Sequence, residues 1–386
     1  MKKLLLFLII FMSVSVSKVS ALSLAPNAKS SILIEASTGE IIYSNNENEK
    51  RAPASMTKMM SLILIMEEID RGNLKWNEKV RISENASSMG GSQIYLEAGE
   101  VMSVRDLVKG IAMASANDAV VALAERISGS EQEFVNKMNN RAKELGLTNT
   151  NFKNATGLDE ENHYSSAKDM SLIAKELVKH KKILDFSSTY EDYLRQNTNK
   201  KFWLVNTNKL IKTYEGMDGL KTGFTENALY CLTATATRNN MRLIGVVMGE
   251  QDSKIRNSEM SDMLDYGFNL YKVKTFIKKG KVVGKYKDKN SSSISTKVIT
   301  KDNINILNKK GNKKRKITYN VRIDKKKLPI KKGEVVGYIY IKEHGKELFK
   351  KEVVAAKRIK KANIFELYMR NIGEFINGDY VLNSSS

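Results

Sequence analysis

The sequence predicts an α+β fold in two domains, and three observations lead to this prediction. The chain has 386 residues, which is long for a single hydrophobic core. Up to about residue 268, apolar stretches of helical and of strand-like pattern predict an antiparallel sheet set against a helical lobe. Between residues 271 and 361 there are 30 Lys and Arg against 7 Asp and Glu, and short strand-like pieces alternate with turns. This second region is typical of a small all-β sandwich.

Residues 1–21 have the pattern of a secretory signal. Lys2 and Lys3 form a charged start, residues 4–16 an apolar core, and residues 19–21 a small-residue cleavage site. The apolar core is shorter than the roughly 20 residues that a spanning helix needs, so a cleaved signal is favoured over an uncleaved anchor. We therefore expect an exported protein.

The first domain is expected to occupy residues 22–268. It opens with two alternating apolar strands at about 31–34 and 40–43, joined by a turn. A helix should begin near Ser55, just after Pro53, and end near Arg71. Further along, the patterns predict a helical region at 104–128 with a break at 115–117, helices at 170–178 and 259–266, and strands at 221–225, 229–237 and 241–248.

Ser55 and Lys58 lie three residues apart at the start of the first helix, so their side chains fall on one face. A serine hydroxyl is a poor nucleophile until a neighbouring group accepts its proton. A lysine can be that group when burial or a nearby cation lowers its pKa from about 10.4 to about 7–8. Taken alone, the spacing is more often an N-cap serine beside a surface lysine.

Two further tripeptides favour the catalytic interpretation. Ser115-Ala116-Asn117 follows the apolar stretch 107–114, and a Lys-Thr-Gly tripeptide at 221–223 lies about a hundred residues beyond it. Serine enzymes that react with penicillin carry three such motifs in this order. The chain resembles the low-molecular-mass penicillin-binding proteins, which are serine D-alanyl-D-alanine carboxypeptidases of bacterial cell-wall maturation, with Ala116 in place of the motif's Asp. The resemblance covers residues 25–265 and includes the segments 31–40, 117–125, 151–154, 157–159, 163–170 and 206–210.

The resemblance implies a penicillin-recognising transpeptidase/β-lactamase-like fold, peptidoglycan stem pentapeptides as substrate, and β-lactam antibiotics as ligands. Ser55 would attack the terminal D-Ala-D-Ala unit, Lys58 would accept the hydroxyl proton, and Ser115 would relay a proton to the departing D-Ala. Six further residues would bind the substrate: Asn117, Lys221, Thr222, Gly223, Thr225 and Arg256.

Two details of the site follow from the same resemblance. The backbone N–H groups of Ser55 and of Phe224 or Thr225 would hold the oxyanion. Lys221 would lower the pKa of Lys58 by repulsion between like charges. From the residues themselves, Asp218-Gly219 is expected to be a turn that presents the strand of Lys221.

Other activities remain open beside that of a carboxypeptidase. Class A β-lactamases carry a glutamate that positions the deacylating water, and no Glu-x-x-x-Asn segment begins here at Glu144, Glu160 or Glu161. A DD-endopeptidase that cuts peptidoglycan cross-links is a further alternative. A non-catalytic wall-binding protein would have no need of the lysine base. The residues favour the carboxypeptidase.

The composition disfavours other kinds of site. With three His and one Cys the chain cannot build a conventional zinc site, and we expect neither a metal nor a cofactor. Cys231 lies in an apolar run and is expected to fill the core. The net charge of +21 could suggest nucleic acid, but export and the lack of a nucleic-acid-binding motif favour anionic wall polymers and phospholipid head groups.

The second domain is expected at residues 269–356, followed by a separate segment at 357–386. Strands are predicted at 281–286, 294–299, 317–323, 335–341 and 350–354. Apolar residues then recur at helical spacing from Ile364 to Ile376, behind a basic lead-in. Such a helix can lie in a membrane interface, and the resemblance implies an anchor on the outer face of the cytoplasmic membrane, at the cell wall. The alternative is that the apolar stripe packs on the sandwich.

Overall fold

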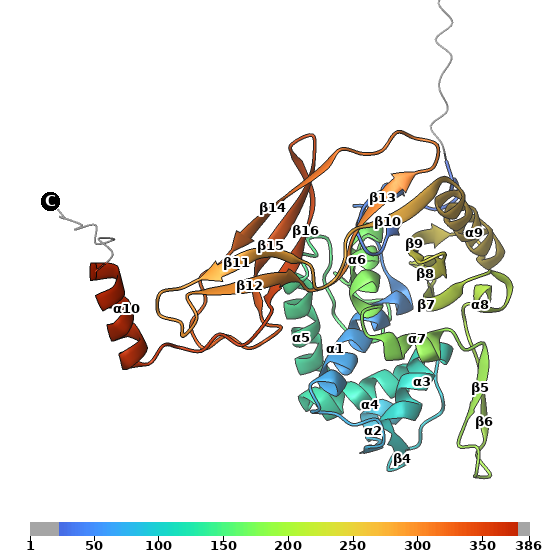
Figure 1. Cartoon of the computed structure of the whole chain (residues 1–386). Helices are drawn as coiled ribbons and strands as arrows, with labels where there is room; N and C mark the ends of the chain where they lie inside the picture. Colours follow the sequence, from blue (N-terminus) through green and yellow to red (C-terminus); the bar gives the residue numbers. More distant parts are fainter. Residues whose placement is uncertain (1–22, 377–386) are drawn as a thin grey trace, which may run out of the picture.

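The computed structural model describes residues 23–376, apart from the side chains of residues 373–375. The expected signal at 1–21 and the tail at 377–386 lie outside the described residues. Figure 1 shows a mixed helical and sheet domain, a β-rich domain that follows it in the chain, and one helix at the far end of the β-rich domain. This arrangement confirms the predicted α+β class with a second, all-β domain.

A five-stranded antiparallel sheet lies at the centre of the α+β domain. Its order is β2-β1-β9-β8-β7. The strands are β1 (Ser30–Glu35), β2 (Ile41–Asn45), β7 (Met217–Thr225), β8 (Leu229–Arg238) and β9 (Met241–Glu250). Because β7 is the edge strand, one side of its backbone has no partner within the sheet.

The edge strand β7 is longer than the sequence analysis expected. Asp218 and Gly219 lie inside it and do not form a turn, so that prediction was wrong. Asp218 instead forms an ion pair with Arg242 of β9, with 2.6 Å between Oδ2 and Nη2. A bulge between Met217 and Gly219 bends the strand without ending it. An Asp-Gly pair fits such a bulge as well as it fits a turn.

The first helix runs through the middle of the helical lobe. A 3₁₀ turn, η1 (Ala54–Thr57), leads into α1 (Lys58–Asp70), and every residue from 58 to 66 is buried. A helix that is apolar on nearly all sides is stable only when protein surrounds it. The predicted break at Ser115 is confirmed, since it lies between α3 (Val104–Ala114) and α4 (Asn117–Ser128).

The remaining elements surround α1 and the sheet (Figure 1). They are α2 (Glu84–Ser87), α5 (Glu131–Glu144), α6 (Ala167–Leu177), α7 (Lys181–Ser187), α8 (Leu210–Thr213) and α9 (Ser253–Leu270), with the two-stranded pairs β3 (Lys79–Arg81) with β4 (Val101–Ser103) and β5 (Glu191–Leu194) with β6 (Phe202–Val205). Successive residues of β1 face opposite sides of the sheet. Ile32 packs into the core that contains α1 and α6, whereas Leu33 packs into the core that contains α9.

The β domain consists of a five-stranded sheet and a two-stranded sheet around one core. The larger sheet has the order β11-β12-β16-β15-β14, and β10 pairs with β13. The strands are β10 (Tyr271–Ile277), β11 (Val282–Lys287), β12 (Ser295–Thr300), β13 (Ile304–Lys309), β14 (Ile317–Ile323), β15 (Val335–Glu343) and β16 (Lys346–Ala355). Ile277, Ile304 and Ile306 of the small sheet share a core with Val298 and Ile339 of the larger one. The predicted strands are confirmed, and β10 and β13 were not predicted.

The last helix, α10 (Ile364–Ile376), places its charged side against the β domain. The Arg370 guanidinium donates to the backbone carbonyls of Lys289 and Ser291. Leu367 and Ile372 are half-buried, but Ile364, Phe365 and Tyr368 are exposed. The alternative that the apolar stripe packs on the sandwich is therefore wrong for these residues. No helix within residues 23–376 is long and apolar enough to cross a membrane.

Candidate active site

Ser55 lies on a tight turn that is held between a loop and the edge strand. Ala54 adopts a positive φ of 46°, and η1 begins there. A Cβ on Gly157 would lie 1.9 Å from the carbonyl oxygen of Ala54, and a Cβ on Gly223 of β7 would lie 3.3 Å from the Ser55 nitrogen. Two glycines thus allow the backbone to close on the turn from both sides, which fixes where the serine hydroxyl points.

Lys58 is hydrogen-bonded to Ser55 and is completely buried. Its Nζ donates to Ser55 Oγ at 2.8 Å and to the carbonyl oxygen of Thr156 at 2.6 Å. Burial lowers the pKa of Lys58 well below its ordinary value, the Lys221 cation lowers it further, and Asp118 opposes the shift. When Lys58 is neutral, the contact with Thr156 occupies one N–H and leaves the nitrogen lone pair available to the serine hydroxyl.

Lys221 occupies the middle of β7 and is also buried. Its Nζ donates to the carbonyl oxygen of Thr222 at 3.0 Å. Burial, followed by repulsion from Arg256, lowers the pKa of Lys221 to about 7. The expected effect of Lys221 on Lys58 is present, but burial is the larger cause of the Lys58 shift. Two lysines and an arginine thus share a site that has little water to screen them.

The two threonines of β7 contact the protein through their hydroxyls. Thr222 donates to Thr207 Oγ1 at 2.8 Å, and Thr225 donates to Asp159 Oδ1 at 2.8 Å. The Thr225 contact joins the end of β7 to the loop that follows Gly157. Both hydroxyls would have to turn or share their hydrogen bonds to meet a substrate carboxylate.

Ser115 and Asn117 lie where α3 ends and α4 begins. Ser115 has left-handed angles with φ 65°, which ends α3 and turns the chain. In residues 23–376 neither Ser115 Oγ nor Asn117 Oδ1 has a hydrogen-bond partner, although both atoms are buried. Buried polar atoms without partners are rare, and these two are available to a ligand. Asn117 Nδ2 donates to the carbonyl oxygen of Gly90 at 2.7 Å, which fixes the orientation of its side chain.

Arg256, near the start of α9, has no carboxylate partner within the described residues although its side chain is nearly buried. Its Nη2 donates to Asn257 Oδ1 at 2.9 Å, and its Nε donates to the same atom at 3.2 Å. The positive charge of Arg256 acts on Lys221 and contributes to the lowered pKa of that lysine. The structure therefore brings together Ser55, Lys58, Lys221 and Arg256, as the sequence analysis expected.

Sequence reasoning missed the residues that support the lysine. Asp118 is fully buried and accepts from the backbone N–H groups of Ile94 and Leu96 at 3.1 and 3.0 Å, so it ties a loop to the start of α4. Thr57 is hydrogen-bonded to His163 at 2.9 Å, and burial lowers the pKa of His163 to about 4. The two ring nitrogens of His163 are hydrogen-bonded to Thr57 and to the backbone N–H of Lys153, so within residues 23–376 the group next to the Ser55 hydroxyl is Lys58 and not His163.

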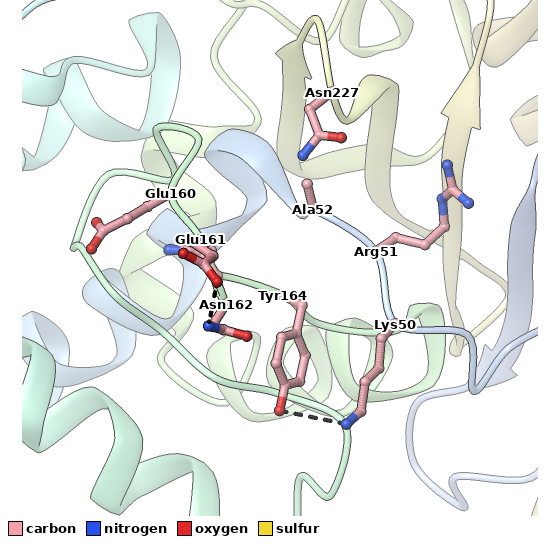
Figure 2. A pocket seen from close by; sticks show the side chains of 9 residues that line it. Lys50, Arg51, Ala52, Glu160, Glu161, Asn162, Tyr164 and Asn227 are labelled. Atoms are coloured by element: carbon pink, nitrogen blue, oxygen red, sulfur yellow. Dashed lines mark hydrogen bonds between the residues drawn. The ribbon is translucent and has the colours of Figure 1, made fainter.

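An open pocket lies on the approach to the nucleophile turn. It is lined by residues that come just before the turn, by the loop after Asp159 and by the turn between β7 and β8: Lys50, Arg51, Ala52, Glu160, Glu161, Asn162, His163, Tyr164 and Asn227. Figure 2 shows basic and acidic side chains on different sides of this pocket. None of the candidate catalytic residues lines it, so the pocket adjoins the Ser55 site and is separate from it.

Neither a metal cluster nor a reactive thiol accompanies this site in residues 23–376. No group of three or more His, Cys, Asp or Glu side chains there could hold a metal ion. Cys231 is buried, and burial raises its pKa to about 11. A thiol in that state is a poor nucleophile, in agreement with its expected role in the core.

Gly157 should be intolerant of any side chain, because a Cβ there meets the turn that carries Ser55. We expect Gly157→Ala to lower the free energy of unfolding by at least about 2 kcal/mol and to slow acylation of Ser55. Gly72 has a similar φ of +79° but no atom within 4 Å of a Cβ. Gly72→Ala is therefore the matched control. It should show the cost of backbone strain alone, and its Ser55 should be acylated at the normal rate. Denaturant unfolding and acylation rates check both variants, and equal effects at the two positions would contradict the packing argument.

The fold and the serine paired with a buried lysine are typical of one class of protein, the serine acyl-transfer enzymes. Comparisons with known proteins agree. Residues 16–252 match the D-alanyl-D-alanine carboxypeptidase family, and residues 271–361 match the C-terminal domain of penicillin-binding protein 5. The D-alanyl-D-alanine carboxypeptidase DacF of Bacillus subtilis is 51% identical over 353 residues, 91% of either chain. DacC of Escherichia coli is 31% identical over 360 residues, 88% of this chain and 86% of its own.

The solved structures give the same result. Penicillin-binding protein 5 from Haemophilus influenzae superposes with a TM-score of 0.69 at 31% identity, covering 87% of this chain and 98% of its own. The chain therefore belongs to the D-alanyl-D-alanine carboxypeptidase family of penicillin-binding proteins.

Proposed function

We propose that this enzyme removes the terminal D-Ala from peptidoglycan stem pentapeptides through an acyl-enzyme on Ser55. The single observation that carries the mechanism is the 2.8 Å contact between Ser55 Oγ and the buried Nζ of Lys58. Burial favours the neutral lysine, and a neutral lysine accepts the hydroxyl proton as the serine attacks. Membership of the carboxypeptidase family supplies the reaction class.

The reaction consists of two acyl transfers. Ser55 Oγ attacks the carbonyl carbon of the penultimate D-Ala while Lys58 takes its proton. As the peptide bond breaks, the leaving amine of the terminal D-Ala receives a proton, which Ser115 relays. Water then attacks the ester, and the shortened stem peptide leaves with a free carboxylate. The backbone N–H groups of Ser55 and of Phe224 or Thr225 would stabilise the oxyanion in both transfers.

Substrate binding would use the free edge of β7 and the unpaired polar atoms around it. An extended peptide can add to an edge strand through backbone hydrogen bonds. Asn117 would hold the substrate amide, and Gly223 allows close approach of the two backbones. Lys221, Thr222, Thr225 and Arg256 would bind the terminal carboxylate, because a cation with few partners inside the protein favours an external anion.

The β-lactamase alternative finds less support. Within residues 23–376 no carboxylate is hydrogen-bonded to Ser55 or Lys58, and Glu160 and Glu161 are exposed in the loop beyond Gly157. Such a site favours slow hydrolysis of the penicilloyl ester. β-Lactams should therefore inhibit the enzyme by leaving a long-lived acyl group on Ser55. An endopeptidase activity would use the same serine with a bulkier leaving group.

The test measures three reactions of the purified enzyme side by side. They are D-Ala release from diacetyl-L-Lys-D-Ala-D-Ala, cleavage of a cross-linked stem-peptide dimer, and turnover of benzylpenicillin. The carboxypeptidase proposal predicts rapid D-Ala release and near-absent penicillin turnover. Turnover of penicillin without D-Ala release would favour the β-lactamase, and faster cleavage of the dimer would favour the endopeptidase.

We also propose the export and the anchoring that the sequence suggests. Residues 1–21 would direct export, residues 22–268 would form the catalytic domain, residues 269–356 the sandwich, and residues 357–386 a membrane-associated segment. The exposed apolar side of α10 and the exposed basic residues of its lead-in, such as Lys357 and Lys360, support this assignment. The enzyme would then work at the outer face of the cytoplasmic membrane.

Removing the apolar side of α10 should release the enzyme from anionic membranes. With Phe365→Glu and Tyr368→Glu together, we expect binding to vesicles of phosphatidylglycerol to fall at least about tenfold, while D-Ala release stays unchanged. Vesicle co-sedimentation measures the binding. Ile41→Glu, at an exposed apolar position on β2, is the matched control and should bind like the wild type. Undiminished binding of the double variant would contradict the anchor.

A further inference from the structure

A pair of carboxyl groups lies buried beside Arg256. Glu250, at the end of β9, has no exposed surface, and in residues 23–376 neither of its carboxyl oxygens has a hydrogen-bond donor. The side chain of Glu259 in α9 is close enough to interact with the Glu250 carboxyl group. Glu259 accepts from the N–H and the Nδ2 of Asn27 at 3.0 and 2.5 Å, and from the N–H of Ala28 at 3.3 Å.

The two carboxyls must share one proton, and that proton belongs on Glu250. Two adjacent buried carboxylates would repel each other, so one of them stays protonated. Glu259 has donors that stabilise its negative charge, whereas Glu250 has none. A protonated Glu250 can donate its own hydrogen to Glu259 and so satisfy the pair. Burial and then Glu259 raise the pKa of Glu250, to about 8.

Arg256 is the group that this proton affects. It lies one turn before Glu259 on α9, and Glu250 is close enough to interact with its charge. An ionised Glu250 would be an internal counter-ion for this nearly buried guanidinium. A neutral Glu250 would not be such a counter-ion, which agrees with Asn257 Oδ1 being the one side-chain acceptor of Arg256 among residues 23–376.

Other titratable groups also act on Arg256, and the carboxylate among them, Asp252, caps α9 by accepting from the backbone N–H groups of Lys254 and Ile255. Tyr230 and Cys231 of β8, Asp252 before α9, and Lys221 of β7 also interact with Arg256. Cys231 stays neutral in the physiological range because burial raises its pKa to about 11. The charge of Arg51, which precedes the nucleophile turn, offsets part of this rise in the pKa of Cys231. Lys221 titrates near pH 7, so any test must separate its contribution from that of Glu250.

We propose that Glu250 is a positioning residue, whose proton, shared with Glu259, keeps Arg256 unpaired and available to the terminal carboxylate of the substrate. This inference rests on the proposed function, because it requires a substrate that ends in a carboxylate. When Glu250 loses its proton, it pairs with Arg256 and competes with the substrate. The Michaelis constant should then rise while kcat stays the same.

The test compares wild type with Glu250→Gln from pH 6 to pH 9.5. Gln keeps the size of the side chain, and its amide can donate to Glu259, but it cannot ionise. With diacetyl-L-Lys-D-Ala-D-Ala, we expect the ratio of wild-type KM to variant KM to rise about tenfold between pH 7 and pH 9.5, with overlapping kcat profiles. Changes caused by Lys221 and Lys58 occur in both proteins and cancel in the ratio. Glu191→Gln, at an exposed position of β5, controls for the loss of one negative charge and should follow the wild type.

Thermal unfolding tests the proton on Glu250 without using activity. The folded pKa of Glu250 lies above its unfolded value, so between the two values the folded state binds the extra proton and stability falls as pH rises. Relative to wild type, Glu250→Gln should therefore be more stable at pH 9 than at pH 5. A constant difference in stability at the two pH values would overturn the proton assignment.

Each outcome of the kinetic test bears on the proposal. Parallel KM profiles in wild type and Glu250→Gln, or a change in kcat alone, would overturn it. If Glu250→Gln does not fold, Glu250→Met takes its place in the same comparison, because Met has a similar volume and cannot ionise; the two outcomes are read in the same way from the KM ratio. A wild-type enzyme that releases no D-Ala at any pH would instead refute the proposed function, while the unfolding measurements would still report on Glu250.

Discussion

Ser55→Ala is expected to abolish D-Ala release while leaving the fold intact. The hydroxyl is the only group of the proposed mechanism that forms a covalent bond with the substrate, so its loss removes the acyl-enzyme pathway. Loss of a serine nucleophile lowers kcat by up to about 10⁶-fold, and we expect a fall of at least about 10⁴-fold here. The measurement is the rate of D-Ala release from diacetyl-L-Lys-D-Ala-D-Ala under saturating conditions.

The structure also predicts what Ser55→Ala leaves unchanged. Only the 2.8 Å bond from Lys58 is lost, and Lys58 keeps its bond to Thr156, so the free energy of unfolding should change by no more than about 1 kcal/mol. Ser61 is the matched control, because it is a buried serine on α1, one element beyond η1, and donates to the carbonyl oxygen of Ala155. Ser61→Ala should retain activity. Residual D-Ala release by Ser55→Ala at a tenth of the wild-type rate would identify another nucleophile.

Replacing Lys58 should produce the second-largest loss of activity. Arg retains the positive charge but cannot give up its proton at any accessible pH, so it cannot act as the base. We expect both Lys58→Arg and Lys58→Met to reduce the acylation rate by about 10²–10⁴-fold. Lys75→Met, at an exposed position beyond α1, should react like the wild type. Stopped-flow measurement of acylation by a chromogenic β-lactam compares the three variants, and normal acylation by Lys58→Arg would contradict the role of a neutral lysine.

The lowered pKa of Lys58 also determines how the activity and the stability of the wild type depend on pH. Because the pKa of Lys58 is lowered, the neutral base becomes available as pH rises well before the ordinary lysine value of 10.5. The acid limb of kcat/KM should therefore lie well below pH 10.

For stability, the unfolded state binds the extra proton between the folded and unfolded pKa values of Lys58, so the free energy of unfolding rises with pH over that window. Lys58→Met should accordingly be more stable than wild type near neutral pH, and this difference should shrink toward pH 10.5.

Much of the fold was predictable because the apolar periodicity of this chain is strong. A helix was predicted from near Ser55 to near Arg71, and η1 with α1 occupies Ala54–Asp70. Ser115 was placed at a break between helices, and its left-handed angles end α3 there. Strand β10 was overlooked although Tyr271–Lys274 alternates apolar residues with lysines, whereas the alternation in β13 is broken at Leu307. The Asp218-Gly219 turn was wrong because a bulge uses the same residues as a turn.

The site was predictable in its residue types but not in its supports. Three short motifs identified Ser55, Lys58 and Lys221, since each motif carries chemistry that its spacing makes recognisable. The carbonyl of Thr156, which orients Lys58, comes from a loop about a hundred residues away, and backbone contacts of this kind leave no pattern in a sequence. The signal that was available is Gly157, whose positive φ of 86° allows that loop to approach the nucleophile turn. Glu250 gave no signal, because a single glutamate at the end of a strand is usually exposed.

Intact-mass analysis of the purified enzyme after reaction with benzylpenicillin tests the central claim most directly. The account predicts a single persistent adduct with the mass of the whole antibiotic, mapping to Ser55 after proteolysis, in a preparation that also releases D-Ala from the peptide. The Ser55→Ala protein should show neither. An adduct on another residue, or penicillin that is hydrolysed without a persistent adduct, would contradict the claim that Ser55 and Lys58 form the acylating pair of a D-alanyl-D-alanine carboxypeptidase.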